Sequence, residues 1–569
     1  MKSFSFLFAG FLLFPGCVSD WHQKNLPVPP GKAVLGTDWY GDSARQLVWL
    51  DQGWSRGDSD WFYNTPQGSE LLPYSYFLAL EQERGGELFR DVRNMQKYRY
   101  LPQTANAANP DALPLGFVKD GEALGLTCAA CHTTQINYRG TAMRIDGGPA
   151  MADFEGFLAD MTSALKATKS EDARFNRFAN RVLGSDADQS QRKELRASLS
   201  QVAAKRSDYD RTNASNNHYG FARLDAFGRI FNNALTLVDK RNGVVPNAPV
   251  SYPHLWDAPH EDYVQWTRVS SNDGVGSLAR NVGEVIGVFA RIHPGNPPPS
   301  ALGYKTSIRL NNLLALETRL KKLESPRWPE NIFGKLDANL VQHGKGLYDI
   351  NCRSCHHDIV RNDPNRRVVT VATPISELQT DPLTAENILR GRGKTGFLEG
   401  TFEFIVAGKR FGPEAPAVQI VGNTVLRTLA GQLTEVKPVQ GAEHLLKIKS
   451  AAFNGTIDAR KMMGRPDEGP RLQYKARPLN GIWATAPYLH NGSVANLYEL
   501  MLPVEKRSRT FAVGRREFDP KNVGFATAQV PGAFNFDTSL QSNHNTGHTY
   551  GAGFSEPERL AVLEYLKSI

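Results

Sequence analysis

Residues 128–132 read CAACH and residues 352–356 read CRSCH, so the pattern Cys-x-x-Cys-His occurs twice in this chain. Two thiols one helical turn apart can both form thioethers with the vinyl groups of a haem. The histidine that follows can then bind the haem iron as its proximal ligand. A zinc site or a thioredoxin-like redox pair would leave the repeated histidine unexplained.

Chance does not account for the repeated motif. The chain has 569 residues with 5 cysteines and 13 histidines, so two accidental matches are expected on the order of once in a million such chains. The sequence therefore predicts two covalently bound c-type haems. Their attachment residues are Cys128, Cys131, Cys352 and Cys355, and their proximal iron ligands are His132 and His356.

The stretches around the second motif predict helices. Residues 337–350 lead as a helix into Cys352, and a capping box at 555–558 opens a last helix that ends at residue 569. Further apolar stripes with helical spacing run over 154–165, 224–238 and 313–323. Because strand signals are weak, we expect a mainly α fold with two c-type cytochrome haem domains, long loops and insertions.

A boundary between the two haem domains is predicted after residue 325, where Pro326 and Pro329 stop an apolar helical stripe. We expect an N-terminal haem domain with insertions over 18–325. A C-terminal c-type cytochrome domain should then cover 326–569.

The first 17 residues have the pattern of a bacterial signal peptide. One lysine precedes an apolar run from Phe4 to Phe14, which is too short for a transmembrane helix. The protein is therefore expected to be periplasmic or secreted. Gly16-Cys17 resembles a lipoprotein cleavage site, although Phe14-Pro15 departs from the usual pattern, so a lipid anchor on Cys17 stays open.

The composition excludes several classes of protein. An apolar fraction of 41% supports a sizeable core, and a net charge of +8 over this length is mild. Because the chain has no sustained run of lysine and arginine and no nucleic-acid motif, we expect no nucleic-acid partner. No later stretch is apolar enough to span a bilayer, so membrane contact is expected only through a lipid anchor.

Two long stretches carry a family resemblance, SPRWPENIFGKLDANLVQHGKGLYDINCRSCH at 325–356 and LNGIWATAPYLHNGSVANLYEL at 479–500. From about Gly116 onward the chain resembles the di-haem bacterial cytochrome c peroxidase superfamily. The peroxidases proper have a distal histidine soon after the first motif, whereas here the next histidine after His132 is His218. The segments LWDAPHEDYVQW at 255–266, LARNVGEV at 278–285 and SNHNTGH at 542–548 are similar to the rubber oxygenase and fatty-acid dioxygenase branch.

The resemblance implies a second axial ligand for the second haem. In the rubber oxygenase branch this ligand is a histidine near the C-terminus, and the matching residue here is His548. His544 is the runner-up, and Met462 or Met463 would take its place in a His/Met haem. We expect His490 to bond a haem propionate or the backbone rather than iron.

Two tryptophans are further candidates for the reactive site. Trp256 and Trp266 are predicted to line the first haem or the gap between the haems, with ordinary buried packing as the alternative. Phe289 has the same alternatives with less weight. His254, His260 and His293 lie in loop-like sequence, so we expect them in solvent rather than on iron.

The two haems are expected to differ in role. A haem that only carries electrons has both axial positions filled, whereas one that activates oxygen or peroxide keeps one position open or displaceable. We therefore assign the chemistry to the first haem, with His132, Trp256 and Trp266 as catalytic residues. The second haem should relay electrons or tune the potential.

Three functions follow from this division. The first is oxygenation or hydroperoxide conversion of an unsaturated apolar fatty acid or polyisoprenoid, with oxygen or peroxide. The second is reduction of hydrogen peroxide by a small electron-donor cytochrome, with Asp153, Glu155 or Asp225 as the acid-base group. The third is electron carriage alone, which would leave well over half of the chain unused. The resemblance also leaves open a calcium ion between the domains.

Overall fold

The computed structural model describes residues 35–274, 276–300, 303–432 and 471–569. The predicted signal peptide with Cys17, and the alternative ligands Met462 and Met463, lie outside these ranges. None of the helices in the described ranges combines the length and the apolar character needed to cross a membrane.

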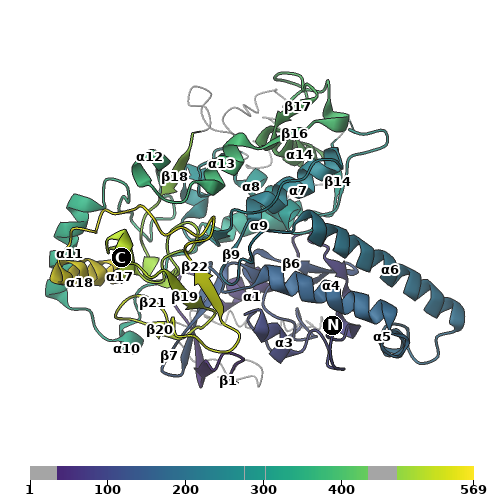
Figure 1. Cartoon of the computed structure of the whole chain (residues 1–569), viewed down its shortest axis with the longest axis horizontal. Helices are drawn as coiled ribbons and strands as arrows, with labels where there is room; N and C mark the ends of the chain where they lie inside the picture. The colour runs from purple at the N-terminus through teal and green to yellow at the C-terminus, as the bar shows by residue number, and fades with distance from the viewer. Residues whose placement is uncertain (1–34, 275, 301–302, 433–470) are drawn as a thin grey trace, which may run out of the picture.

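Helices and short strands alternate along the described chain (Figure 1). The longer helices are α1 (Arg56–Asn64), α4 (Phe154–Ser170), α5 (Asp172–Leu183), α6 (Gln189–Thr212), α7 (Ala226–Val238), α8 (Gly276–Gly287), α9 (Leu310–Leu320), α11 (Ala338–Asn351), α13 (Leu383–Arg390), α14 (Ala417–Gln432) and α18 (Glu556–Ser568). The shorter helices and 3-10 turns are α2 (Tyr74–Ala79), α3 (Val92–Lys97), α10 (Glu330–Phe333), α12 (Ile375–Leu378), α17 (Leu497–Leu500), η1 (Cys128–Ala130), η2 (Ala258–His260), η3 (Gly396–Leu398), η4 (Ile482–Ala484) and η5 (Val504–Lys506).

The strands form small sheets of two or three strands each. One three-stranded sheet has β8 (Thr141–Asp146) at its centre, parallel to β3 (Gln46–Trp49) and antiparallel to β7 (Thr133–Tyr138). The other is antiparallel and has the order β4 (Leu72–Pro73), β6 (Ala123–Leu126), β5 (Phe117–Asp120). The two-stranded sheets, all antiparallel, are β1 (Gly36–Thr37) with β2 (Ser43–Ala44), β9 (Arg223–Leu224) with β10 (Val250–Ser251), β11 (Tyr263–Val264) with β12 (Ser270–Ser271), β13 (Ile292–His293) with β14 (Lys305–Thr306), β15 (Val371–Pro374) with β18 (Gln473–Ala476), β16 (Arg392–Lys394) with β17 (Glu414–Pro416), β19 (Thr510–Val513) with β22 (Phe534–Asp537), and β20 (Phe518–Asp519) with β21 (Gly524–Phe525).

The prediction of a mainly α fold with two cytochrome domains is wrong. The structure has 38% helix and 17% strand, so it is mixed α/β. The first motif shows the difference most clearly, because η1 is a 3-10 turn between β6 and β7 and not the end of a long helix. Strands of two residues such as β1 are too short to show the alternation by which a strand is recognised in sequence, and the six-residue strands β7 and β8 are buried on both faces and so do not alternate.

The helices predicted on either side of the second motif are confirmed as α11 and α18, which lie side by side (Figure 1). The Glu558 side chain accepts from Ser555 N at 2.8 Å and so forms part of the predicted capping box. A Cβ atom on Gly344 of α11 would lie 1.9 Å from the carbonyl oxygen of Ala561 on α18. The missing side chain therefore lets the two helices approach closely.

The largest buried cluster contains residues from both sides of the predicted boundary at residue 325. Ile136 and Leu313 come from the N-terminal part, and Trp483 and Leu563 come from the C-terminal part. The halves are also joined by a backbone hydrogen bond of 2.8 Å from Asn137 N to Arg516 O. The two parts therefore share a core, and the predicted domain limits stay a prediction.

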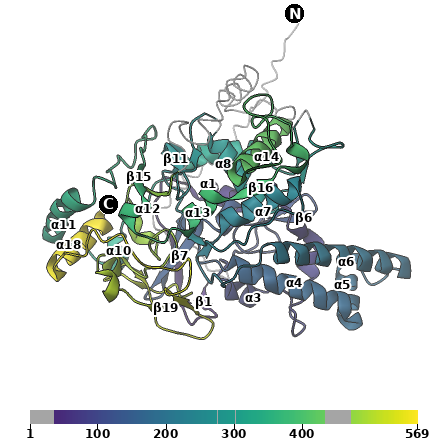
Figure 2. The ribbon, with the colours of Figure 1, turned by 45° about the horizontal axis from the view of Figure 1, so that its top comes forward.

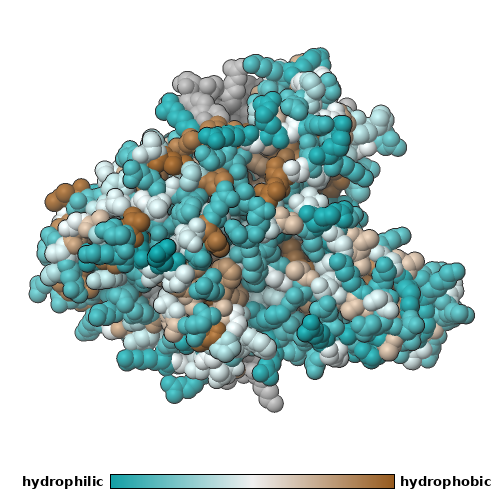
Figure 3. Space-filling view, viewed as in Figure 1, coloured by the Kyte–Doolittle hydropathy of each residue, from teal (hydrophilic) through white to brown (hydrophobic). Residues whose placement is uncertain are grey.

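Helices α4, α5 and α6 extend away from the rest of the molecule in both ribbon views (Figures 1 and 2). They pack against one another, and α4 shares a buried cluster with Ala130 of the first motif, while α11 before the second motif lies at the opposite end of the molecule in Figure 1. The face in Figure 3 is mainly hydrophilic, and its hydrophobic side chains gather in several separate groups rather than in one broad patch.

Candidate functional site

Both motifs fold into the same local turn. In the first, the backbone N–H groups of Cys131 and His132 donate to Cys128 O at 3.2 and 2.9 Å. In the second, those of Cys355 and His356 donate to Cys352 O at the same two distances. Each turn therefore presents two cysteines and a histidine in one short segment.

Each proximal histidine is held by a backbone carbonyl far along the chain. His132 Nδ1 lies 2.8 Å from Pro253 O, and His356 Nδ1 lies 2.7 Å from Arg477 O. Because a carbonyl oxygen can only accept, Nδ1 carries the proton and Nε2 keeps its lone pair. A histidine that binds a metal through Nε2 needs this tautomer.

Burial keeps both proximal imidazoles neutral. It lowers the pKa of His132 to about 4 and also lowers the pKa of His356 below its usual range. Neutral imidazole is the form that binds iron, because protonation would occupy the Nε2 lone pair. Both residues therefore have the position, the tautomer and the charge state of a proximal ligand.

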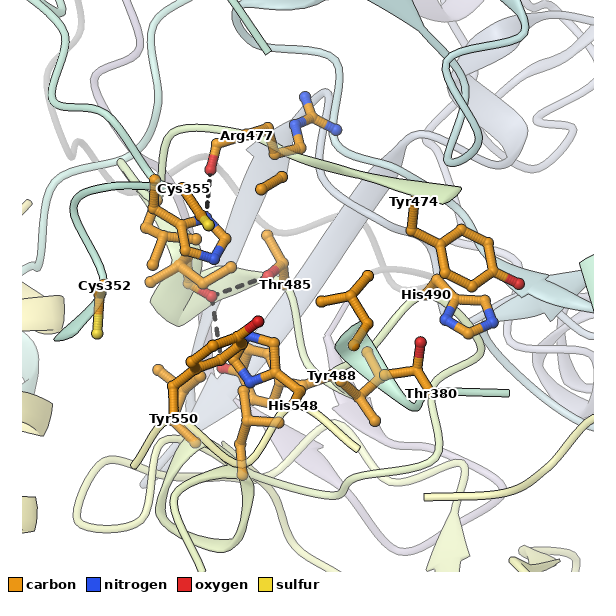
Figure 4. Close-up of a pocket in the computed structure, with 18 of the residues that line it drawn as sticks. Cys352, Cys355, Thr380, Tyr474, Arg477, Thr485, Tyr488, His490, His548 and Tyr550 are labelled. Carbon is orange, nitrogen blue, oxygen red and sulfur yellow. Dashed lines mark hydrogen bonds between the residues drawn. The ribbon is translucent and has the colours of Figure 1, made fainter. Parts of the chain in front are cut away.

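A cavity of about 310 Å³ lies against the second motif (Figure 4). Cys352, Cys355 and His356 line one part of it, and His548 lies across from them. Much of the remaining wall is apolar and includes Leu479, Ile482, Leu489, Leu497, Met501 and Leu566. Its size and apolar lining fit a small-molecule or cofactor site.

His548 faces His356 across this cavity. Their ring centres are 6.2 Å apart, with 55° between the ring planes. A metal–imidazole nitrogen bond is about 2 Å long, so two imidazoles on opposite sides of one metal ion have ring centres about 6 Å apart. Burial lowers the pKa of His548 to about 4, so this ring is neutral as well. The runner-up His544 instead places its Nδ1 3.2 Å from Thr538 O.

The far end of the cavity offers polar atoms without partners. Ser251 Oγ, Thr380 Oγ1 and His490 Nε2 are buried and have no hydrogen-bond partner among the described residues, and all three residues line this cavity. Figure 4 shows Thr380 and His490 at the end opposite Cys352. Buried polar atoms of this kind normally have a partner. A haem fits both ends, since its vinyl groups meet the cysteines and its propionates can accept from the polar group.

The first motif is held in different surroundings. Gln67 Oε1 lies 3.1 Å from both the backbone nitrogen and the Sγ of Cys128. Burial raises the pKa of the Cys128 and Cys131 thiols to about 12, so both are neutral thiols. The ring next to His132 is that of Tyr252, edge-on with centres 6.3 Å apart. A Cβ atom on Gly116 would lie 2.3 Å from Ala130 N, so this glycine lets the chain pass close to the motif.

A carboxyl group beside the first motif was missed in the sequence. Glu284 on α8 accepts a hydrogen bond of 2.8 Å from Gln265 Nε2, and burial raises its pKa above the usual range. Its charge is close enough to raise the pKa of both thiols of the first motif. The signal available was an acidic residue on a helix whose other side chains are mostly apolar.

The structure places both candidate tryptophans in the segment between the motifs. Trp256 is fully buried, stacks on His254 with ring centres 4.3 Å apart, and donates to Asn480 O at 3.0 Å. Trp266 is half-buried, donates to Ser251 O at 3.2 Å, and lines the cavity of the second motif. Their assignment as catalytic residues stays a prediction.

The other ring residues are placed as follows. Phe289 stacks on Phe154 with ring centres 6.1 Å apart. His254 is buried, so its prediction as a solvent residue is wrong, because packing against Trp256 covers it. His260 is half-buried and His293 is exposed.

The three acid-base candidates have other partners. Asp153 accepts from Gly156 N at 2.8 Å as the N-cap of α4. Glu155 accepts from His218 Nδ1 at 2.8 Å. Asp225 accepts from two backbone N–H groups, at 2.7 and 2.9 Å. Within the described ranges, no group of three or more His, Cys, Asp or Glu side chains could hold a metal ion, and the calcium ion stays a prediction.

Comparisons with known proteins agree with the chemistry of the second motif. A family model described as RoxA-like, cytochrome c-like matches residues 473–512, which include Arg477 and His490. The match lies on one side of the second cavity and does not reach either cysteine motif. It therefore indicates one cytochrome c-like region, and with it a c-type haem.

Two proteins of Sinorhizobium fredii are similar in sequence. The uncharacterized protein y4iJ is 30% identical over 92% of this chain and 93% of its own length. The uncharacterized protein y4iM is 41% identical over 16% of this chain and 22% of its own length. The chain therefore belongs to the family of y4iJ, and its RoxA-like segment supports a c-type haem oxidoreductase on the rubber oxygenase branch.

Proposed function

We propose that this protein is a di-haem c-type oxidoreductase that oxygenates an unsaturated apolar substrate, or converts its hydroperoxide, at the first motif. One observation carries the proposal. The rings of His356 and His548 face each other with centres 6.2 Å apart, whereas the aromatic ring in contact with His132 within the described residues is the edge-on ring of Tyr252. A centre with both axial positions filled suits electron relay, and a centre with an open position suits substrate chemistry.

The chain positions the first centre through a few contacts. A c-type haem attached to Cys128 and Cys131 supplies an iron that binds oxygen or peroxide and exchanges single electrons. Pro253 O keeps the His132 proton on Nδ1 and fixes the ring, and Gln67 holds the Cys128 end of the turn. These contacts involve fixed groups, so they need little rearrangement when the charge on the centre changes.

A second cavity supports an apolar substrate. Its volume is about 890 Å³, and its lining combines apolar residues such as Leu72, Ile286 and Phe289 with charged residues such as Asp120, Arg206 and Arg309. Phe289 and Cys131 pack against the same buried cluster, so the cavity and the first motif share a core. Each buried methylene contributes about 0.8 kcal/mol, so the apolar part of the lining would favour a long fatty acid or polyisoprenoid chain.

The second motif serves as the electron relay in this proposal. Its haem is attached to Cys352 and Cys355 and bound by His356 and His548. The signal-peptide pattern of residues 1–17 supports a periplasmic or secreted location, with Cys17 as the lipid anchor if it is acylated. Covalent attachment suits such a location, because the cofactor cannot be lost by dilution.

The peroxidase alternative has one observation in its favour. Glu284 is a half-buried carboxyl group whose pKa is raised by desolvation near the first motif, so it holds a proton at higher pH than an ordinary glutamate. Such a group can act as the general acid that peroxide cleavage requires. A small cytochrome would then supply electrons through the second haem.

The test uses the purified holoprotein. A pyridine haemochrome assay should give two covalent haems per chain, and oxygen uptake should follow addition of an unsaturated fatty acid or a polyisoprenoid without an external reductant. His132→Ala should abolish this uptake. Rapid turnover of hydrogen peroxide with a reduced small cytochrome, with both apolar substrates left unchanged, would replace the proposal by the peroxidase. If the protein turns over neither the apolar substrates nor hydrogen peroxide, electron carriage alone becomes the assigned function.

A further inference from the structure

The carbonyl groups that hold the two proximal histidines are connected to each other. His132 Nδ1 donates to Pro253 O, and His356 Nδ1 donates to the backbone oxygen of Arg477. The Arg477 side chain turns back and donates from Nη2 to His254 O at 3.1 Å. Since His254 follows Pro253 in the chain, one dipeptide and one arginine join the two imidazoles without a gap.

The residues that form this connection are buried and held in place by neighbouring side chains. Arg477 and His254 are both 7% exposed, and Trp256 stacks on the His254 ring. Arg477 Nε lies 3.0 Å from Glu261 Oε1, and Lys475 Nζ also pairs with this buried carboxylate. A buried, ion-paired guanidinium has little freedom to leave its acceptors.

We infer that Arg477 is a positioning residue that couples the two haem centres, by linking the peptide that holds His132 to the carbonyl that holds His356. This rests on the proposed function, because it requires a haem at each motif. Contiguous hydrogen-bonded networks carry coupling between sites better than separate groups do. When one electron passes between the centres, one iron becomes ferric as the other becomes ferrous, and both Nδ1 protons stay in their hydrogen bonds.

The connection also provides a path by which the redox state of one centre affects the potential of the other. Oxidation of one iron strengthens the N–H donor of its histidine, because the ring loses electron density to the metal. The carbonyl that accepts this bond is then polarised, and the effect passes through Arg477 to the other histidine. The potential of each centre should therefore depend on the redox state of the other.

Arg477→Lys is the direct test. Lysine keeps a positive charge beside Glu261, but a single ammonium group cannot replace the planar fork that reaches both Glu261 and His254 O. After flash reduction by a deazaflavin radical, electron exchange between the haems should slow roughly tenfold, the size expected for one link in a hydrogen-bond network. The Soret bands should show unchanged axial ligation of both haems.

Lys475→Met is the matched control. Lys475 pairs with the same buried Glu261, but its side chain contacts neither His254 O nor a carbonyl that holds a proximal histidine. Its exchange rate should stay within about twofold of the unmodified protein. The double variant Arg477→Gln with Glu261→Gln removes both charges together and should behave like Arg477→Lys, which keeps the test valid if the single variant does not fold.

The outcomes separate the two proposals. Unchanged exchange in Arg477→Lys, or equal slowing in Lys475→Met, overturns the coupling role and leaves the proposed function intact. A single covalent haem per chain in the unmodified protein overturns both. Slowed exchange in the Arg477 variants alone, with two haems attached, supports the coupling role.

Discussion

The region around Cys128–His132 and the region around Cys352–His356 use the same turn in different surroundings. The first turn lies between strands β6 and β7, while the second follows the 14-residue helix α11. Both turns end in a histidine whose Nδ1 meets a carbonyl 121 residues further on. What differs is the ring that each histidine contacts, because His356 faces the imidazole of His548, whereas His132 meets the edge of Tyr252, the residue before Pro253.

If a haem is bound at each motif, its role should be set by the residues around the motif. The cysteine motif and the proximal histidine are equivalent in the two regions, so they cannot distinguish a reactive centre from a relay. The opposite side of the ring comes from a different part of the chain in each region. Differences in function are therefore expected to follow from residues such as His548, Tyr252 and Glu284 rather than from the motifs.

Removing His548 should have the largest effect. His548→Ala takes away the imidazole across from His356, so one low-spin haem signal should become high-spin while the other haem is little changed. Optical and EPR spectra of the oxidised protein measure this directly. His544→Ala is the control and should leave both signals as they were. If the low-spin signal survives in His548→Ala, the ligand is His544 or a methionine outside the described ranges.

The next largest effects are expected from two glycine substitutions, each of which should weaken only one of the two regions. Gly344→Ala forces α11 and α18 apart at Ala561, and overpacking of this kind costs about 1–3 kcal/mol. Gly116→Ala meets Ala130 N and also needs a positive φ, which adds about 1–2 kcal/mol. Thermal unfolding and haem incorporation should show Gly344→Ala weakening the second site and Gly116→Ala the first. Equal loss of both haems in either variant would mean that the shared core, not the local contact, controls haem insertion.

The smallest expected effect is on the pH dependence of the free energy of unfolding, through Asp153 near the first region. Burial raises the pKa of Asp153 from 3.8 to about 6, so the folded protein keeps this proton where the unfolded chain has lost it. Its contribution to the free energy of unfolding should therefore fall as the pH rises from about 4 to about 6, by at most about 3 kcal/mol. The Asp153→Asn variant keeps a side-chain oxygen that can cap α4, but its side chain cannot ionise.

Denaturant unfolding at several pH values checks this. The Asp153→Asn variant should gain stability relative to the unmodified protein as the pH rises over this window, since it avoids the buried charge. A constant difference between the two proteins at every pH would show that Asp153 does not titrate there. The second site should be unaffected, because Asp153 caps α4.

The sequence was sufficient for features that depend on a few neighbouring residues. The helices around the second motif follow from spacing and capping within short segments and are confirmed, while the attachment cysteines and proximal histidines stay predictions from the spacing of each motif. The family resemblance also pointed to His548, which the structure places across from His356. The sequence failed for the strands, which are either very short or, like β7 and β8, buried on both faces, and for His254, which Trp256 covers.

By itself, the sequence determined the two Cys-x-x-Cys-His turns, because each turn closes within five residues. Only the tertiary structure decided what each histidine meets. Pro253, Arg477, Tyr252, Glu284 and the unpartnered polar atoms of the second cavity come from distant segments. Hydrophobic spacing records which face of an element is buried, but not which element covers it, so contacts across 121 residues are set by packing alone.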